Sequence, residues 1–294
     1  MTDLTDATPI LSSATEFLAG YDGVICDLWG VVHNGVRPHQ GAVDTLIGLR
    51  AKGVPVLLLS NAPRPYPSVE AQLDHLGVSR EAYDGILTSG DLTRDAIAGG
   101  GYGQVYLNLG PSRDHPTTDG LALVEGDIDT ADFILCTGLY DDTTEQPSDY
   151  KELFTVAIRR KLAMVCANPD IVVQRGDDII YCAGALAQLY RKMGGAAVLF
   201  GKPEEKTFTA ALGRLSEIAA KPIAADRAVM IGDGLKTDIT GANRSGLACL
   251  LIGHGIHGEE LGYRPGKPLD GARVMAALAD RGLTATAAMG ALQP

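Results

Sequence analysis

Four polar motifs could do chemistry together, because each of them closely follows a short apolar run. They supply carboxylates, a hydroxyl, an amide and an amine: Asp27, Ser60-Asn61, Lys202, and Asp233 with Asp238. Two acids five residues apart suit a hard cation such as Mg²⁺, which prefers oxygen ligands. A small hydroxyl can hold a phosphoryl oxygen, and a lysine can neutralise a carboxylate and a phosphate together. The set predicts a cation-assisted site for a phosphorylated ligand.

Each motif alone has an ordinary structural explanation. A lone aspartate can cap a turn, Ser-Asn can begin a loop, a lysine is usually a solvated surface charge, and Gly-Asp-Gly is usually a turn. The shared placement of all four after strand-like runs favours a functional site, because open α/β sheets bind ligands at the carboxyl ends of their strands. A carboxylate at the tip of a buried strand, such as Asp27, is also costly unless it has a partner or a role.

The elements that position these motifs alternate between strands and helices. Strand-like runs cover Gly23–Asp27, Val54–Ser60, Gln104–Leu109, Phe133–Thr137, Leu162–Ala167, Ala197–Phe200, Ala228–Ile231 and Ala248–Ile252. Helical patterns cover Gly41–Lys52, Pro67–Leu76, Glu204–Ala219 and Asp238–Ser245. This alternation predicts an α/β fold with a parallel sheet covered on both faces. We expect the polar stretch Leu109–Asp129 to be irregular and the small residues of Thr284–Pro294 to fray.

Composition narrows the class of protein and of partner. The 294 residues suffice for one large or two medium domains, and the formal charge of −11 argues against nucleic acid as the main partner. The five cysteines are far apart and lack a CxxC metal motif, so we expect buried thiols in a reducing compartment. No apolar run is long enough to span a bilayer, and residues 1–16 lack the order of a signal peptide. These observations predict a cytoplasmic enzyme with no membrane partner.

The order of the four motifs resembles that of the haloacid dehalogenase-like (HAD) superfamily, and the surrounding stretches resemble its class IIA, NagD-like phosphatases. The segment from Gly30 to Ala42 is similar to the DGV…G…P…GA stretch of that class. Asn168-Pro169-Asp170, Ala183–Leu186 and Gly201-Lys202-Pro203 are similar to its NPD…GxGxL…GKP series. Residues 232–255 resemble its motif IV region over the full length, so the resemblance runs roughly from Tyr21 to Gly255.

This resemblance implies a Rossmann-like HAD core with a parallel sheet, into which an α/β cap domain is inserted. The core would comprise residues 1–87 and 196–294, and the cap would comprise residues 88–195. Such a cap would close over Asp27 and exclude water while it selects the substrate. Arg175 and the Cys182–Gly184 turn would face the pocket.

The resemblance also implies a role for each motif residue. Asp27 would be the catalytic nucleophile that forms an aspartyl-phosphate, which divides one hard displacement into two easier steps. Ser60 and Lys202 would bind the transferring phosphoryl group. The remaining predicted roles are substrate binding by Asn61, Arg64, Arg175 and Gly184, and Mg²⁺ binding by Asp27, Asp233, Asp238 and the backbone carbonyl of Trp29. The metal would offset repulsion between the nucleophile and an incoming phosphate.

Trp29 departs from the family pattern, because phosphatases of this family carry an aspartate two residues after the nucleophile as general acid and base. An indole cannot deliver a proton, and general acid catalysis is typically worth about 10²–10⁴ in rate. The substrate could therefore have a good leaving group, or His33 could supply the proton. Alternatively, the protein no longer hydrolyses phosphate esters efficiently.

Three functions follow from these residues. The first is a Mg²⁺-dependent phosphatase of a small phosphorylated metabolite, either a sugar phosphate or a nucleotide. The second is a non-hydrolytic or weakly active protein that binds a phosphorylated ligand. The third is hydrolysis of a C–halogen bond or another non-phosphate bond through an Asp27 ester. The expected partner is the small metabolite rather than nucleic acid or membrane, and a homodimer is compatible with the sequence.

Overall fold

The computed structural model describes residues 7–176 and 178–294. Its chain divides into two compact α/β units, each with a parallel sheet. The first unit extends to Leu59 and adds Leu73–Ile86 and Phe208–Pro294, whereas the second comprises Ser60–Gln72 and Leu87–Thr207. We describe each unit by itself.

The first unit is built on a six-stranded sheet with the order β13-β12-β11-β1-β2-β3. Its strands are β1 (Gly23–Asp27), β2 (Val56–Ser60), β3 (Gly85–Thr88), β11 (Ala228–Gly232), β12 (Ala248–Ile252) and β13 (Ala287–Met289). Strands β1, β2 and β11 are buried along their whole length, as expected for central strands of a parallel sheet. The register pairs Cys26 with Ile231 and Asp27 with Leu59, so the polar residues after these strands begin at one edge of the sheet.

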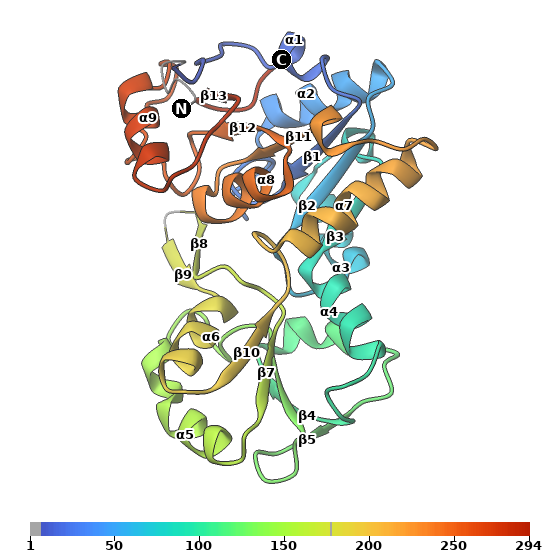
Figure 1. Cartoon of the computed structure of the whole chain (residues 1–294), viewed down its shortest axis with the longest axis vertical. Helices are drawn as coiled ribbons and strands as arrows, with labels where there is room; N and C mark the ends of the chain where they lie inside the picture. The colour runs from blue at the N-terminus through green and yellow to red at the C-terminus, as the bar shows by residue number, and fades with distance from the viewer. Residues whose placement is uncertain (1–6, 177) are drawn as a thin grey trace. The chain divides into compact units, whose positions relative to one another are not determined.

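Helices surround this sheet in Figure 1. They are α1 (Thr15–Leu18), α2 (Gln40–Ala51), the end of α3 (Tyr66–Leu76), α7 (Glu205–Ile218), α8 (Thr240–Ser245) and α9 (Gly271–Ala279), together with the short helices η1 (Arg80–Ala82) and η4 (Ala225–Arg227) and the π-turn η5 (Leu235–Ile239). Helix α7 packs directly on the sheet: a Cβ added to Gly23 would lie 2.7 Å from the Leu215 side chain, and one added to Gly85 would lie 3.0 Å from that of Ile218. Glycines in the strands therefore let the helix approach the sheet closely.

The second unit has a five-stranded sheet with the order β10-β7-β6-β4-β5, and its four pairs of neighbouring strands are parallel. The strands are β4 (Val105–Leu109), β5 (Val124–Gly126), β6 (Phe133–Cys136), β7 (Ala163–Cys166) and β10 (Ala196–Leu199). An antiparallel hairpin joins β8 (Val172–Arg175) to β9 (Asp178–Tyr181). The helices are α4 (Ser89–Ala98), α5 (Lys151–Arg159) and α6 (Ala183–Lys192), with the 3₁₀ helices η2 (Ser112–Thr117) and η3 (Pro147–Tyr150).

Side-chain alternation along the strands of the second unit produces two hydrophobic clusters. Ile134 and Cys136 belong to a cluster with residues of α5 and α6, whereas Phe133 and Leu135 belong to a cluster that contains Ile97 of α4. Because successive strand residues point to opposite faces, the two clusters cover the two faces of one sheet. The predicted fold class, a Rossmann-like parallel α/β core with an additional α/β unit, is confirmed.

Several local expectations were wrong. Residues 284–294 do not fray: β13 joins the first sheet, and Ala288 and Leu292 are buried. The stretch from Leu109 to Asp129 is not wholly irregular, since it contains η2 and β5. The sequence analysis missed β3, β5, β8, β9 and β13, and it placed the β10 run in the core, whereas β10 pairs with β7 in the second sheet. The limits of a cap domain remain a prediction, and we now propose that its second limit follows β10.

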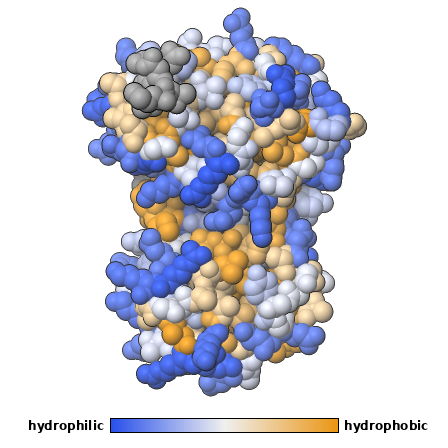
Figure 2. All heavy atoms as spheres, viewed as in Figure 1, coloured by the Kyte–Doolittle hydropathy of each residue, from blue (hydrophilic) through white to orange (hydrophobic). Residues whose placement is uncertain are grey.

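Three further observations concern the surface, the cysteines and the apolar character of the helices. Figure 2 shows hydrophilic residues over much of one face, interrupted by smaller hydrophobic areas. All five cysteines are free and buried, as the sequence analysis expected. Within residues 7–176 and 178–294, no helix has both the length and the apolar character needed to cross a membrane.

Candidate active site

Three buried carboxylates of the first unit converge at the carboxyl end of its sheet. Asp27 is the last residue of β1, Asp233 directly follows β11, and Asp238 lies in the π-turn η5. Each can place a carboxylate oxygen within 4.8 Å of the others, and none is more than 7% exposed. Three negative charges so close together in a buried place repel one another strongly unless a cation or proton compensates them. The all-oxygen donor set fits Mg²⁺.

Glycines make room for these carboxylates. A Cβ added to Gly30 would lie 2.2 Å from the Asp233 carboxylate, and one added to Gly255 would lie 1.7 Å from it. Asp238 packs in the same way against Gly232, whose added Cβ would be 2.3 Å from the Asp238 side chain. The glycines of the motif therefore have a steric role, because larger residues would displace the acids.

Backbone amides hold two of the acids in place. The Ile256 N–H donates to Asp233 Oδ2 at 2.9 Å, and the Gly234 N–H donates to Asp238 Oδ2 at 2.9 Å. Hydrogen bonds of this kind favour the charged form of a carboxylate and fix its orientation. The structure thus brings together the three acids that were predicted as metal ligands.

The second unit contains the predicted phosphoryl-binding motifs, joined through the side chain of Asn61. The Lys202 N–H donates to Asn61 Oδ1 at 2.7 Å, and Asn61 Nδ2 donates to the Lys202 carbonyl at 3.2 Å. Nδ2 also donates to Asp170 Oδ1 at 2.8 Å. Asn61 thus clamps the backbone of Lys202, which is only 2% exposed. Its predicted role in substrate binding remains a prediction, and the observed contacts make it a positioning residue.

The turn before Lys202 depends on close packing. Gly201 has a positive φ of 115°, and an added Cβ would lie 2.5 Å from Asn61 Oδ1 and 2.9 Å from Ser89. The Ser89 hydroxyl donates to the Ala167 carbonyl at 2.5 Å and also lies 2.9 Å from the Ala62 carbonyl oxygen. Ser60, the last residue of β2, accepts a hydrogen bond from the Ala62 N–H at 3.1 Å. Ser89 and Asp170 are positioning residues that sequence reasoning missed, although Asp170 belongs to the Asn-Pro-Asp motif.

The remaining predicted substrate-binding residues also belong to the second unit. Arg64 Nε lies 3.5 Å from Asp114 Oδ1, and Arg175 makes an ion pair of 3.0 Å with Asp142. Gly184 lies in the first turn of α6, and an added Cβ would be 2.2 Å from the Pro169 carbonyl oxygen. This contact gives Gly184 a packing reason beside its predicted role, which stays a prediction.

Trp29 lies in the first unit against the loop that follows β1. A Cβ added to Gly35 would be 2.5 Å from the indole, and the rings of Trp29 and His33 meet edge to face with centroids 5.1 Å apart. His33 Nδ1 accepts a hydrogen bond from the Gly35 N–H at 3.0 Å. Burial, and after it the nearby His39, lower the pKa of His33 to about 4. An imidazole that is neutral at pH 7 is a poor general acid, so the structure argues against His33 as the missing proton donor.

Comparisons with known proteins point to one family. Residues 24–115 match the model of haloacid dehalogenase-like hydrolases, and residues 199–280 match a second, HAD-hydrolase-like model. A haloacid dehalogenase-like hydrolase from Brucella suis 1330 has a similar structure, with a TM-score of 0.85 and 40% sequence identity over 96% of this chain and 100% of that one.

Two curated relatives are phosphatases. D-glycerol 3-phosphate phosphatase of Mycobacterium tuberculosis is 28% identical over 81% of this chain, but the match covers only 64% of that protein's length. Acid sugar phosphatase of Staphylococcus aureus is 25% identical over 80% of this chain and 88% of its own. These matches confirm the resemblance that the motifs indicated.

Proposed function

The chain belongs to the haloacid dehalogenase-like family of hydrolases, and on this premise we propose that it is a Mg²⁺-dependent phosphatase of a small phosphorylated metabolite. The observation that carries the proposal is the cluster of three buried carboxylates in the first unit. The names of the relatives favour a sugar phosphate or a glycerol phosphate over a nucleotide. The five buried thiols accord with a cytoplasmic location.

Asp27 is the proposed nucleophile. Its carboxylate oxygen attacks phosphorus, the bond between phosphorus and the ester oxygen breaks, and the released alkoxide takes a proton. Water then attacks the phosphorus of the aspartyl-phosphate, which releases inorganic phosphate and restores the Asp27 carboxylate. Two displacements through a covalent intermediate are each easier than direct hydrolysis.

Asp27, Asp233, Asp238 and the Trp29 carbonyl would hold Mg²⁺. When bound, the ion supplies charge stabilisation for the phosphoryl oxygens and reduces the repulsion between them and the nucleophile. The backbone bonds to Asp233 and Asp238 would keep their carboxylates oriented for this purpose. The glycines around the acids would preserve the space that the carboxylates and a cation need.

Ser60 and Lys202 would bind the transferring phosphoryl group, through a hydroxyl and an ammonium. Lys202 is buried, and its backbone is held on both sides by Asn61. Because the Lys202 backbone is held rigidly, its ammonium group would already point at the phosphoryl group. Less conformational entropy would then be lost in the transition state.

The weakest part of this chemistry is proton delivery, because position 29 carries an indole. This observation supports the second candidate function, in which the protein binds a phosphorylated ligand and turns it over slowly or not at all. As a phosphatase, the protein should prefer esters with good leaving groups, since these need no proton.

Turnover of p-nitrophenyl phosphate with and without Mg²⁺ separates the two functions. The phosphatase proposal expects Mg²⁺-dependent release of p-nitrophenol that disappears in Asp27→Asn. If release is absent, but inorganic phosphate with Mg²⁺ raises the melting temperature, the binding function is favoured. If p-nitrophenol is not released and inorganic phosphate with Mg²⁺ does not raise the melting temperature, both candidate functions are wrong.

A further inference from the structure

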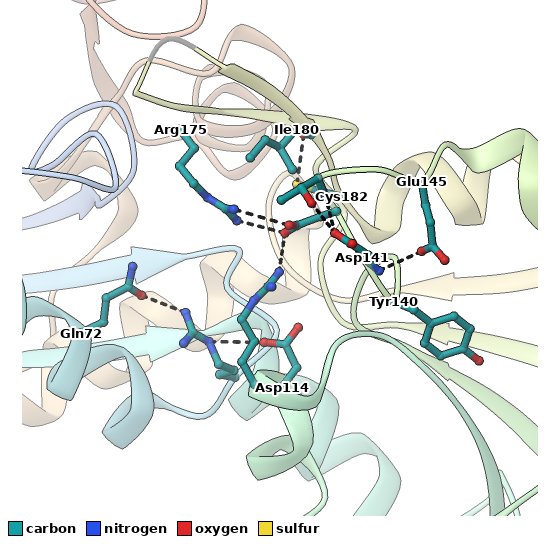
Figure 3. Close-up of polar contacts among 12 residues, drawn as sticks. Gln72, Asp114, Tyr140, Asp141, Glu145, Arg175, Ile180 and Cys182 are labelled. Atoms are coloured by element: carbon teal, nitrogen blue, oxygen red, sulfur yellow. Dashed lines mark hydrogen bonds and ion pairs between the residues drawn. The ribbon is translucent and has the colours of Figure 1, made fainter.

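A second charged cluster lies wholly within the second unit, and the catalytic proposal does not use it. Arg113 makes an ion pair of 2.5 Å with Asp142, and Arg175 donates to both oxygens of Asp142, at 3.0 and 3.4 Å. Beside them, Arg64 pairs with Asp114. We call these three arginines and two aspartates the arginine cluster; Figure 3 shows its contacts around Asp114 and Arg175.

The cluster is arranged with its acids buried and two of its three arginines accessible, whereas the Arg64 side chain is 21% exposed. The side chains of Asp114 and Asp142 are 5% and 8% exposed, whereas those of Arg113 and Arg175 are 47% and 36% exposed. A ligand that approaches from solvent therefore meets guanidinium groups before carboxylates. Three arginines against two aspartates leave one positive charge in excess, in a chain whose formal charge is −11.

The arginines keep unused capacity for an anion. A guanidinium carries five N–H donors, and it suits carboxylate and phosphate oxygens in a bidentate geometry. Arg113 reaches Asp142 through Nη2. Arg64 is more fully engaged, because it donates from Nη2 to Gln72 at 2.8 Å and its buried Nε lies 3.5 Å from Asp114 Oδ1.

The titration of the acids agrees with this geometry. Burial alone would raise the pKa of Asp142, but the hydrogen bond from Arg175 and the charge of Arg113 outweigh it and lower that pKa. Burial raises the pKa of Asp114 above its usual value despite the attraction of Arg64 and Arg113. Asp142 is thus the acid whose charged form the arginines stabilise most clearly.

Packing within the second unit ties the cluster to the predicted phosphoryl-binding residues. Arg64 lies four residues after Ser60, so their Cα atoms are at most about 14 Å apart, which is the length of a small metabolite. The Thr117 hydroxyl donates to the Pro63 carbonyl at 2.8 Å, and this bond fastens helix η2, which carries Arg113, to the turn that carries Arg64. The Thr88 hydroxyl donates to the Arg64 carbonyl at 2.8 Å.

We propose that the arginine cluster binds a second anionic group of the substrate, a carboxylate or a second phosphate, and so selects metabolites with two anionic groups. Arg113 supplies exposed donors, Arg64 adds positive charge beside it, and Arg175 keeps Asp142 in place. This inference rests on the proposed phosphatase function and specifies its substrate class. Each new bidentate contact also gives geometric selectivity, because it fixes the distance between the two anionic groups.

The test compares pairs of substrates that differ in one anionic group. Glycerol 3-phosphate with 3-phosphoglycerate examines a carboxylate, and fructose 6-phosphate with fructose 1,6-bisphosphate examines a second phosphate. The natural protein should favour the doubly anionic member of at least one pair by about tenfold or more in kcat/KM, chiefly through KM. Arg113→Gln should reduce that preference about tenfold. Arg214→Gln is the matched control, because Arg214 pairs with Glu217 on the exposed surface of the first unit, and it should keep the preference.

The outcomes separate this inference from the phosphatase function. Equal kcat/KM for both members of both pairs would overturn the inference while leaving the phosphatase function intact. A loss in Arg113→Gln that is the same for both members, or a fall in melting temperature alone, would make the cluster merely structural and would also overturn it. If no substrate is turned over, calorimetric titration with 3-phosphoglycerate decides: binding weakened selectively in Arg113→Gln supports the cluster, and unchanged or absent binding overturns it.

Discussion

The acidic cluster of the first unit and the arginine cluster of the second unit handle charge in opposite ways. The first gathers three buried carboxylates, Asp27, Asp233 and Asp238, whose oxygen atoms are close enough together to hold one cation. The second gathers charges of both signs, which compensate one another except for one positive charge. On the proposed function, one cluster would hold a metal and the nucleophile, and the other would bind an anion.

On the two proposals, chemistry would reside in the first unit and substrate selectivity in the second. The acids lie on β1, on the residue after β11 and on the turn that follows, so the strands and short turns of one sheet fix them. The arginines lie on a turn, on helix η2 and at the end of β8, and these three elements do not belong to one sheet. Neighbouring strand ends of one sheet hold catalytic groups rigidly, whereas separate peripheral elements can differ with the substrate.

The largest expected effect follows from changing the nucleophile. Asp27→Asn should reduce turnover of any phosphate ester by about 10⁴-fold or more, because an amide is not a competent nucleophile. The fold should survive, since the amide is nearly isosteric and also relieves repulsion among the three acids. Steady-state rates and circular dichroism measure both effects, and unchanged turnover would show that the motif assignment fails.

The next effect separates the two clusters by their response to Mg²⁺. A cation that binds only the folded state stabilises it by about 2.7 kcal/mol at one hundred times its dissociation constant. For a domain of this size, that corresponds to a rise of about 5–10 °C in melting temperature. Calorimetric melting with Mg²⁺ and with EDTA should show the rise in the natural protein and lose most of it in Asp233→Asn.

The arginine cluster supplies the control for this experiment. Arg113→Gln removes a charge in the other unit and should retain the full Mg²⁺-dependent rise. A rise that persists undiminished in Asp233→Asn would mean that the stabilising ion binds elsewhere.

Strong local patterns made much of the fold predictable. The run Gly23–Asp27 matches β1 at both ends, because a central buried strand is uniformly apolar and ends at a charged residue. The final stretch was misjudged, because Ala287 and Ala288 are too small to suggest a strand, although pairing with β12 buries them. The hairpin of β8 and β9 escaped notice for another reason: its residues are half-exposed and mixed in polarity, and tertiary contacts decide their conformation.

Part of the candidate site was also predictable from the sequence. Asp27, Asp233 and Asp238 were found because motif and strand end coincide, and the structure brings them together. The pairing of Arg113 with Asp142 was not predictable, because the two residues are 29 positions apart and belong to no motif. Such contacts depend on how loops pack, which periodicity and spacing do not report.

A smaller effect is expected from the clamp that holds Lys202. Asn61→Ala removes both hydrogen bonds to the Lys202 backbone and leaves buried polar groups unsatisfied, at a cost of about 1–3 kcal/mol in stability. A misplaced ammonium should lower kcat about 10–100-fold, because positioning errors of about 1 Å can cost about 10²-fold.

Asn243 offers a matched control in the first unit. Its side chain clamps the backbone of Thr284 in the same way, accepting from the Thr284 N–H and donating to the Thr284 carbonyl, both at 2.9 Å. Asn243→Ala should destabilise the protein less, because these bonds are exposed and water can replace them, and it should leave kcat unchanged. Equal losses of kcat in the two variants would reduce Asn61 to a purely structural residue.

The smallest expected effect, and the one that most sharpens the account of catalysis, concerns Trp29. Trp29→Asp places a carboxyl two residues after Asp27, where family phosphatases carry their acid and base. Full recovery of general acid catalysis would be worth about 10²–10⁴ in rate. We expect about tenfold, because the indole packs on Gly35 and His33, and its removal leaves a void and a new half-buried charge. The gain should appear with alkyl phosphates, whose leaving oxygen needs a proton, and not with p-nitrophenyl phosphate.

Trp29→Phe is the control, since it keeps an aromatic ring without a carboxyl and should give no gain on either ester. If Trp29→Asp fails to improve the alkyl ester relative to the aryl ester, the indole is not simply a missing acid. Its ring would then be a wall of a pocket adapted to binding, and the non-hydrolytic function would take precedence over the phosphatase.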